Sequence, residues 1–392
     1  MKMMGAVMAL TALAALPALS ANPPQPAGPQ LQAVLNEVVA GSKEHLGVLA
    51  NVSAPRIHLE WSGAAGWASR ESSSRLRANQ PFRIASVTKV FVAAATFRLI
   101  EEGRLGLYDP ISIHITPEIA RILESGGYDP ARITIAELLG HTSGLYDYAM
   151  DPSYDRAVQA NGRKMWTGTE QIQWAMQRGK PIGRPGEKYS YADTNYVILG
   201  QIIERASGQA LAAYVREALQ FHAIGMSSTY WEMLESAPRG EPPRAHQYFD
   251  NVDITDYNPS MDLYGGGGLV STTADLSRFM RSLLTGRLFE DRSTLATSLL
   301  PVETERPMTH GRSLMLATVQ FGRHTCWGHA GYWGTLAFYC PDIDAAVAVN
   351  IDQSLDDQAD GAGTNIRKLL SGLASALDGA AAEVEGARHD HR

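Results

Sequence analysis

The stretch Phe82-Arg-Ile-Ala-Ser-Val-Thr-Lys-Val-Phe-Val-Ala-Ala-Ala95 opens an apolar segment that stops at Gly103, and this pattern predicts a buried helix. Ser86 and Lys89 are three residues apart, so they share one face at its start. A buried lysine with a lowered pKa can take the proton of a serine hydroxyl. The helix N-terminus adds free N–H groups where an acyl transfer develops an oxyanion. The alternative is an N-cap serine beside a solvated lysine.

The composition describes a globular chain with no basic surface for nucleic acid. The 392 residues carry 34 Lys and Arg against 41 Asp and Glu, a formal charge of −7, which excludes a nucleic-acid-binding footprint. Apolar residues make up 45% of the chain, enough for a large core. Because single cores stop growing at about 250–300 residues, we expect two domains or one domain with an insertion.

Both ends of the chain combine a helical stripe with short β-like runs, whereas the middle is mostly helical. Terminal strands that meet across such a middle predict an α+β fold in which an antiparallel sheet, flanked by helices, is built from both chain ends. The expected boundaries are a sheet domain from residues 31–104 and 313–377, a helical insertion at 105–312, and a disordered tail at 378–392 with too little apolar surface to pack.

The first residues are typical of a secretory signal. Lys2 precedes an uncharged apolar run of about 15 residues, and the small residues at 18–21 suit a signal peptidase. The run is shorter than the roughly 20 residues of a membrane-spanning helix. We therefore expect a signal at 1–21, a Pro-rich linker at 22–30, no stable membrane anchor, and a periplasmic or secreted protein.

The two cysteines allow two interpretations. If residues 331–334 form a hairpin loop, Cys326 and Cys340 lie opposite each other on neighbouring strands. A disulfide is then geometrically possible in an oxidising compartment. The alternative is two reduced cysteines in the sheet.

Two further segments supply candidate site residues. Tyr191 and Asp193 lie on a loop that leads into a helix. A buried lysine nearby can lower the pKa of a tyrosine hydroxyl toward formation of the phenolate, so that the tyrosine acts as general base and acid. His329 and Gly331 lie on the expected hairpin, where glycine would let a substrate backbone approach the strand edge.

In this order the three segments resemble the S-x-x-K, Y-x-N and H-x-G motifs of the serine penicillin-recognising enzymes, which include class C β-lactamases, D-alanyl-D-alanine carboxypeptidases and β-lactamase-like esterases. The resemblance covers roughly residues 30 to 375, and the matching motifs are Ser86-Val-Thr-Lys89, Tyr191-Ala-Asp193 and His329-Ala-Gly331. It implies the β-lactamase/transpeptidase-like fold.

The resemblance also implies roles for these residues. Ser86 would be the acylated nucleophile, Lys89 its proton partner, and Tyr191 the group that protonates the leaving group and later activates water. The backbone N–H groups of Ser86 and Tyr332 would form the oxyanion hole. His329 would orient Tyr191 or meet a substrate carboxylate. The expected substrate-binding residues are Asp193, His329, Gly331 and Tyr332.

The sequence departs from the family pattern at positions that contact substrate. Asp193 replaces the usual Asn, and an ionised carboxylate only accepts hydrogen bonds. Ala330 and Tyr332 stand where carboxypeptidase relatives carry Thr hydroxyls for the substrate's terminal carboxylate, which makes an uncharged ester or amide more plausible.

The leading hypothesis is a secreted D-alanyl-D-alanine carboxypeptidase-like serine hydrolase that acts on a small molecule or peptide through an acyl-enzyme. The alternatives are an esterase or weak class C-type β-lactamase, and a non-catalytic penicillin-fold binding protein. No cofactor or metal site is expected. We interpret His141 and Ser143 as hydrogen-bonded turn residues, and the aspartates at 250, 253, 256 and 262 as a solvated acidic loop.

Overall fold

The structure is a computed structural model that describes residues 27–42, 46–71, 74–249, 252–305, 311–352 and 362–389. The expected signal segment lies outside these residues. Helix α1 (Gly28–Gly41) begins inside the expected linker, with Pro29 in its first turn, where a missing N–H costs nothing. Within the described part of the chain, no helix combines the length and apolar character needed to cross a membrane.

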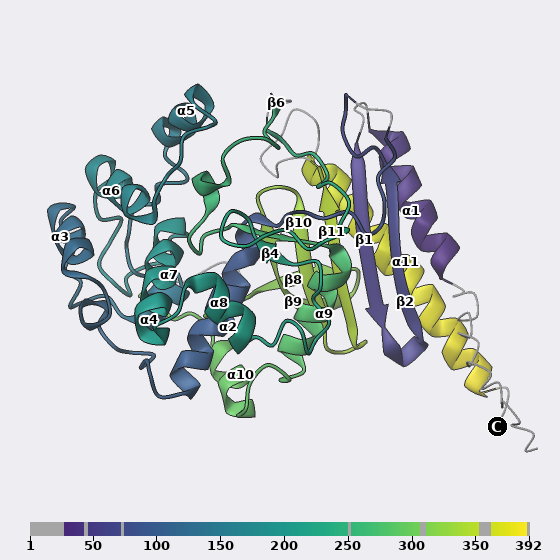
Figure 1. The fold of residues 1–392 in the computed structure, drawn as a ribbon. Coiled ribbons are helices and arrows are strands. Elements are labelled where there is room, and N and C mark those ends of the chain that lie inside the picture. The colour runs from purple at the N-terminus through teal and green to yellow at the C-terminus, as the bar shows by residue number, and fades with distance from the viewer. Residues whose placement is uncertain are drawn as a thin grey trace, which may run out of the picture.

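A six-stranded antiparallel sheet joins the two ends of the chain, as expected (Figure 1). The N-terminal part supplies β1 (Gly47–Ala54) and β2 (Leu59–Gly66). The C-terminal part supplies β8 (Ala317–Phe321), β9 (His324–Gly331), β10 (Thr335–Cys340) and β11 (Ala345–Ile351). The strand order is β2-β1-β11-β10-β9-β8, so the β1–β11 pair joins the two halves. The predicted α+β architecture, with an antiparallel sheet built from both chain ends, is confirmed.

Helices α1 and α11 (Ala362–His389) pack together over the outer face of the sheet (Figure 1). Leu31 and Leu35 of α1 and Leu373 and Leu377 of α11 are buried against the outward-facing strand residues. The predicted tail disorder is wrong for residues 378–389, which continue α11. Ala380 still packs against this outer core, and the alanine-rich sequence beyond it has high helix propensity.

The inner face of the sheet is covered by α9 (Thr273–Leu284), which packs against β1, β10 and β11 although it lies inside the expected insertion. Helix α2 (Thr88–Glu101) follows, with Phe91 stacked on Phe279 of α9 at 3.6 Å between ring centroids. Helices α7 (Asp193–Ser207) and α8 (Leu211–Ala218) cover the other side of α2. One continuous core therefore extends from the sheet into the helical region.

The remaining elements lie at the end of the molecule away from α1 and α11, or between the two parts (Figure 1). The helices are α3 (Pro117–Ser125), α4 (Ile135–Leu139), α5 (Pro152–Ala160), α6 (Gly168–Arg178) and α10 (Arg292–Ser298). Short strands β3 (Phe82–Arg83), β7 (Leu269–Ser271) and β4 (Tyr230–Trp231) form a small sheet, and β5 (Tyr248–Phe249) pairs with β6 (Val252–Asp253).

Cys326 on β9 and Cys340 on β10 form a disulfide, which decides between the two interpretations of these residues. The bond closes a loop with a sequence separation of 14.

Replacing both cysteines with alanine is expected to lower the free energy of unfolding by about 3 kcal/mol, because a cross-link that closes a loop of this size reduces the conformational entropy of the unfolded chain. Urea denaturation with and without reductant measures this. Reductant should destabilise the wild type and leave the double variant unchanged; equal stability of the reduced and oxidised wild type would contradict the prediction.

Candidate active site

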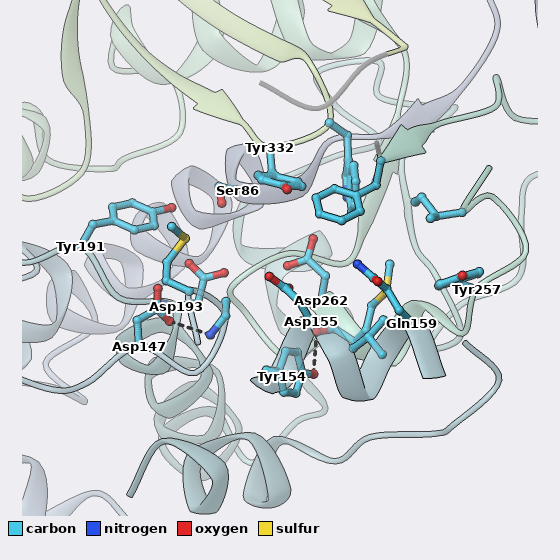
Figure 2. A pocket seen from close by; sticks show the side chains of 17 residues that line it. Ser86, Asp147, Tyr154, Asp155, Gln159, Tyr191, Asp193, Tyr257, Asp262 and Tyr332 are labelled. Atoms are coloured by element: carbon cyan, nitrogen blue, oxygen red, sulfur yellow. Dashed lines mark hydrogen bonds between the residues drawn. The ribbon is translucent and has the colours of Figure 1, made fainter. Parts of the chain in front are cut away.

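Ser86 lies in a one-turn 3-10 helix (Ala85–Val87) directly before α2. The preceding residue, Ala85, has φ of +45°, a left-handed conformation that is strained for a residue with a Cβ. Strain of this kind persists only where the surrounding structure imposes it, and it clusters at functional sites. The turn presents Ser86 at the wall of a cavity (Figure 2).

Lys89 is fully buried, and its ammonium contacts three oxygens. Its Nζ lies 2.9 Å from Ser86 Oγ, 2.6 Å from the Gly266 carbonyl and 2.8 Å from Asp193 Oδ1. Burial lowers the pKa of Lys89, but the charges of Asp193, Tyr191 and Asp262 together with the hydrogen bond to Asp193 outweigh it, and the net pKa is raised. The predicted lowering of the Lys89 pKa is therefore wrong. Lys89 is therefore an ammonium that donates to Ser86 Oγ, and the alternative of a solvated lysine is also excluded.

Tyr191 lies just before α7, with its hydroxyl directed toward Ser86 (Figure 2). Burial raises the pKa of Tyr191, and Lys89 and hydrogen bonds with Lys89 and Ser86 offset this only in part. The expected phenolate is wrong for the resting state, in which the hydroxyl keeps its proton. Tyr191 can therefore donate a proton only while accepting another.

The ring of His141 packs against the ring of Tyr191. The two rings stack at 4.2 Å between centroids, and His141 Nδ1 accepts a hydrogen bond from the Ala192 backbone N–H at 3.1 Å. Burial lowers the pKa of His141 well below its usual value, so the ring is neutral. Ser143 instead donates to Asn195 Oδ1 at 2.6 Å. The interpretation of His141 and Ser143 as hydrogen-bonded turn residues is confirmed.

Four aspartates line the cavity that holds Ser86, and we call three of them, Asp147, Asp193 and Asp262, the acidic trio. Asp147 Oδ1 accepts from the backbone N–H of Asp193 at 3.0 Å, which ties the first two together at the start of α7. Asp262 lies in the cavity wall, so its assignment to a solvated loop is wrong. Neither Asp147 nor Asp262 was predicted as a site residue. For Asp147 the available signal was its place between the buried residues Leu145 and Tyr148.

Gly331 brings the β9–β10 hairpin against the Ser86 turn. A Cβ on Gly331 would lie 2.2 Å from the backbone oxygen of Ile84, so only glycine permits this approach. Tyr332, the next residue, lines the cavity with Ser86. His329 lies beside Tyr191, at 6.3 Å between ring centroids, and its Nδ1 is 2.6 Å from the Ala330 carbonyl. Burial and the charge of Lys89 lower the pKa of His329 to about 3, so its neutral ring offers no charge to a substrate carboxylate.

The cavity has a volume of about 230 Å³. Its polar lining consists of Ser86, Tyr191, the acidic trio, Asp155, Gln159 and several tyrosines, and the rest is apolar or aromatic. Among the described residues that line it, none is Lys, Arg or His. The structure thus brings all seven predicted site residues together: Ser86, Tyr191, Asp193 and Tyr332 at the cavity, and Lys89, His329 and Gly331 directly behind or beside them.

The family model described as Beta-lactamase matches residues 36–370 of the chain. The chain belongs to the beta-lactamase family. Penicillin-binding protein 4* of Bacillus subtilis (strain 168) is 28% identical to this family member over 233 residues, which are 56% of the chain and 48% of the relative. The chain thus spans about half the length of this curated relative. A putative D-alanyl-D-alanine carboxypeptidase of Salmonella agona (strain SL483) is 24% identical over 334 residues, 74% of the chain and 75% of the relative.

Among solved structures, the D-stereospecific amidohydrolase from Streptomyces sp. matches this beta-lactamase family chain with a TM-score of 0.70 and 27% identity. The match covers 86% of this chain and 98% of the other. The family assignment and the shared fold confirm the predicted β-lactamase fold.

Proposed function

We propose that this protein hydrolyses an amide or ester through an acyl-enzyme on Ser86, and that the leaving group of its substrate carries no carboxylate. One observation carries the proposal: Ser86 Oγ, held by Lys89, faces a cavity lined with aspartates, and none of the described residues that line it has a cationic side chain. Such a surface repels a substrate carboxylate. The similarity to a D-stereospecific amidohydrolase supports the choice of an amide.

The protonation states of the site suggest how the acyl-enzyme forms. Ser86 Oγ attacks the carbonyl carbon while its proton passes to the Tyr191 oxygen, and Tyr191 gives its own proton to the leaving nitrogen or oxygen as that bond breaks. In the second half-reaction a water molecule attacks the acyl carbon and gives a proton to Tyr191. The bond from the acyl carbon to Ser86 Oγ then breaks, and Ser86 Oγ takes the proton of Tyr191. Tyr191 is neutral before and after each step, which agrees with its raised pKa.

Lys89 and two backbone groups have electrostatic roles in this proposal. The Lys89 ammonium stays charged and donates to Ser86 Oγ, so it stabilises negative charge on that oxygen during attack and departure. The backbone N–H groups of Ser86 and Tyr332 are the proposed oxyanion donors, because Gly331 allows the hairpin to approach the Ser86 turn.

A D-alanyl-D-alanine carboxypeptidase is the second candidate. It is supported by the matches to putative enzymes of that name and by Arg312, a cation close enough to His329 to lower its pKa. The Arg312 guanidinium lies 5.1 Å from the Tyr189 ring centroid. In a carboxypeptidase it would be the group that meets the terminal carboxylate. Esterase and weak β-lactamase activities use the same Ser86 chemistry.

The test offers the mature protein a p-nitrophenyl ester, an amino acid amide, a fluorescent penicillin and a peptide that ends in D-Ala-D-Ala, each with Ser86→Ala as control. We expect turnover of the ester or amide and an acyl adduct on Ser86 in the intact mass of the wild type only. Release of D-Ala that is lost in Arg312→Gln, without ester or amide turnover, would select the carboxypeptidase. Equal behaviour of wild type and Ser86→Ala with all four compounds would refute catalysis and leave a binding protein.

Export to the periplasm or the cell exterior is part of this proposal. The Cys326–Cys340 disulfide supports it, because such bonds persist in oxidising compartments and are rare in the cytosol.

A further inference from the structure

We propose that the cavity beside Ser86 binds the protonated amine of its substrate, through Asp262 and Asp147, and packs an apolar group next to it. The substrate class is then an amide or ester that carries an ammonium group and an apolar side chain. This inference rests on the proposed function for its link to turnover, but the binding itself can be measured without turnover.

The first argument is the charge balance of the site. Lys89 faces the acidic trio and is paired with Asp193 at 2.8 Å, which leaves Asp147 and Asp262 without a cation of their own within ion-pair distance among the described residues. Carboxylates in a buried site need a compensating positive charge or a proton. A substrate ammonium supplies the missing charge.

The second argument is an unpartnered oxygen. Asp147 is 9% exposed, and its Oδ2 is buried without a hydrogen-bond partner among the described residues. Its other oxygen is used, because Oδ1 accepts from the backbone N–H groups of Asp193 and Ala149. An oxygen left open in this way costs free energy unless a ligand or a proton satisfies it. Because Asp147 lines the cavity, an ammonium bound there is the partner that the proposal gives it.

The third argument is the way the chain makes room for these carboxylates. An added Cβ on Gly267 would lie 2.4 Å from the carboxylate of Asp262, and one on Gly266 would lie 3.3 Å from Asp193 Oδ2. Two adjacent glycines therefore hold these two carboxylates side by side, although like charges repel. Figure 2 shows both carboxylates in the cavity below Ser86.

The rest of the cavity favours an apolar group. Met150, Val158, Ile254, Met261 and Phe249 also line the cavity, together with Tyr257. Such a lining holds an alkyl or aromatic side chain, while the carboxylates hold the amine. An ammonium group on an apolar side chain matches both halves of the cavity.

The pH dependence of amine binding follows from the groups that face the two aspartates. Burial, and then the charge of Asp193, raises the pKa of Asp147 to about 8 and that of Asp262 to about 7. Lys89 opposes both shifts. At Asp262, Arg83 also opposes the shift and Glu232 adds to it. Because an ammonium prefers the ionised carboxylates, its binding competes with these protons and weakens as the pH falls through 8 and 7.

The binding test uses phenethylamine and its neutral analogue 2-phenylethanol, measured by titration calorimetry on the wild type. Phenethylamine keeps its charge up to about pH 9, because a primary alkyl amine has a pKa near that of lysine, about 10.4. At pH 8 we expect it to bind about tenfold more tightly than the alcohol, and at pH 5.5 we expect most of this preference to be lost. Equal affinity for the two compounds at pH 8, or a preference that does not change with pH, would overturn the proposal.

Variants identify the residues. Asp262→Asn keeps the shape of the side chain and is expected to lower the preference for the amine about fivefold or more. The matched control is Asp256→Asn, which removes the same charge from an exposed position in the same segment and should keep the wild-type preference. An equal loss in both variants would assign the effect to the general negative field and contradict the role of Asp262. The wild-type comparison decides the proposal even if Asp262→Asn does not fold.

A substrate pair connects binding to turnover. The p-nitroanilide of phenylalanine, in both enantiomers, is compared with 3-phenylpropionyl p-nitroanilide, which lacks only the amine. We expect a higher kcat/KM for one phenylalanine enantiomer than for the compound without the amine. If Ser86-dependent turnover has the same kcat/KM with and without the amine, the proposed hydrolysis stands and this inference fails. If calorimetry shows the amine preference but no compound is turned over, the binding site stands and the proposed function fails.

Discussion

Lys89→Met is expected to lower kcat/KM for a neutral p-nitrophenyl ester by about 10³-fold, at the upper end of the range for loss of one preorganised donor that stabilises developing charge. The ammonium donates to Ser86 Oγ at 2.9 Å, and methionine fills a similar volume without a donor. The Ser86 oxygen then loses the positive charge that stabilises it in both half-reactions. Steady-state kinetics measure the effect, which should fall on kcat, because the substrate itself does not contact the buried Lys89.

The same variant should also be less stable, which allows the two roles of Lys89 to be separated. Removal of one partner of a buried ion pair lowers the free energy of unfolding by about 3–5 kcal/mol. In this variant Asp193 lies beside Asp147 and Asp262 without the ammonium of Lys89 that paired with it. The double variant Lys89→Met/Asp193→Asn removes both charges and should regain most of this stability without regaining activity. If the double variant regains activity, Lys89 acts only by neutralising Asp193, and the proposed mechanism is wrong.

Gly331→Ala is expected to lower kcat for the same ester by about 10²-fold, the usual effect of losing one oxyanion donor. The added methyl group would meet the Ile84 carbonyl at 2.2 Å, a backbone atom that cannot rotate away. The hairpin must therefore move from the Ser86 turn, and it carries the Tyr332 N–H with it. KM should change less than kcat, because the donor contributes most as charge develops.

Gly328→Ala is the matched control for this prediction. Gly328 lies on the same strand, and its added Cβ would meet the Ala337 carbonyl at 2.5 Å, inside the sheet and not at the Ser86 turn. Both variants should unfold at lower temperature than the wild type, but only Gly331→Ala should lose most of its kcat. Similar kcat losses in the two variants would assign the effect to damage of the hairpin, and Tyr332 would not be an oxyanion donor.

The sequence predicted the parts of the site that depend on local spacing. Ser86 and Lys89 are three residues apart at a helix start, which places them together in any fold that forms this helix. Cys326 and Cys340 lie opposite each other because hairpin pairing follows from the position of the loop. Predictions based on distant neighbours were less accurate. Helix α9 was assigned to the insertion because its amphipathic pattern does not say which surface its apolar face covers.

The α+β architecture, the joining of both chain ends in one sheet and the seven predicted residues around Ser86 follow from the order of residues alone. Local periodicity and ordered motifs carry that information. The charge states and the two further aspartates of the site depend on the folded structure. Lys89 keeps its proton because nearby charges, that of Asp193 first among them, outweigh burial, whereas Tyr191 keeps its proton because burial outweighs the charge of Lys89. Asp147 and Asp262 are more than a hundred residues apart in the sequence, and only folding brings them to one cavity. A pKa depends on the three-dimensional arrangement of charges and on burial, and neither can be read from the order of residues along the chain.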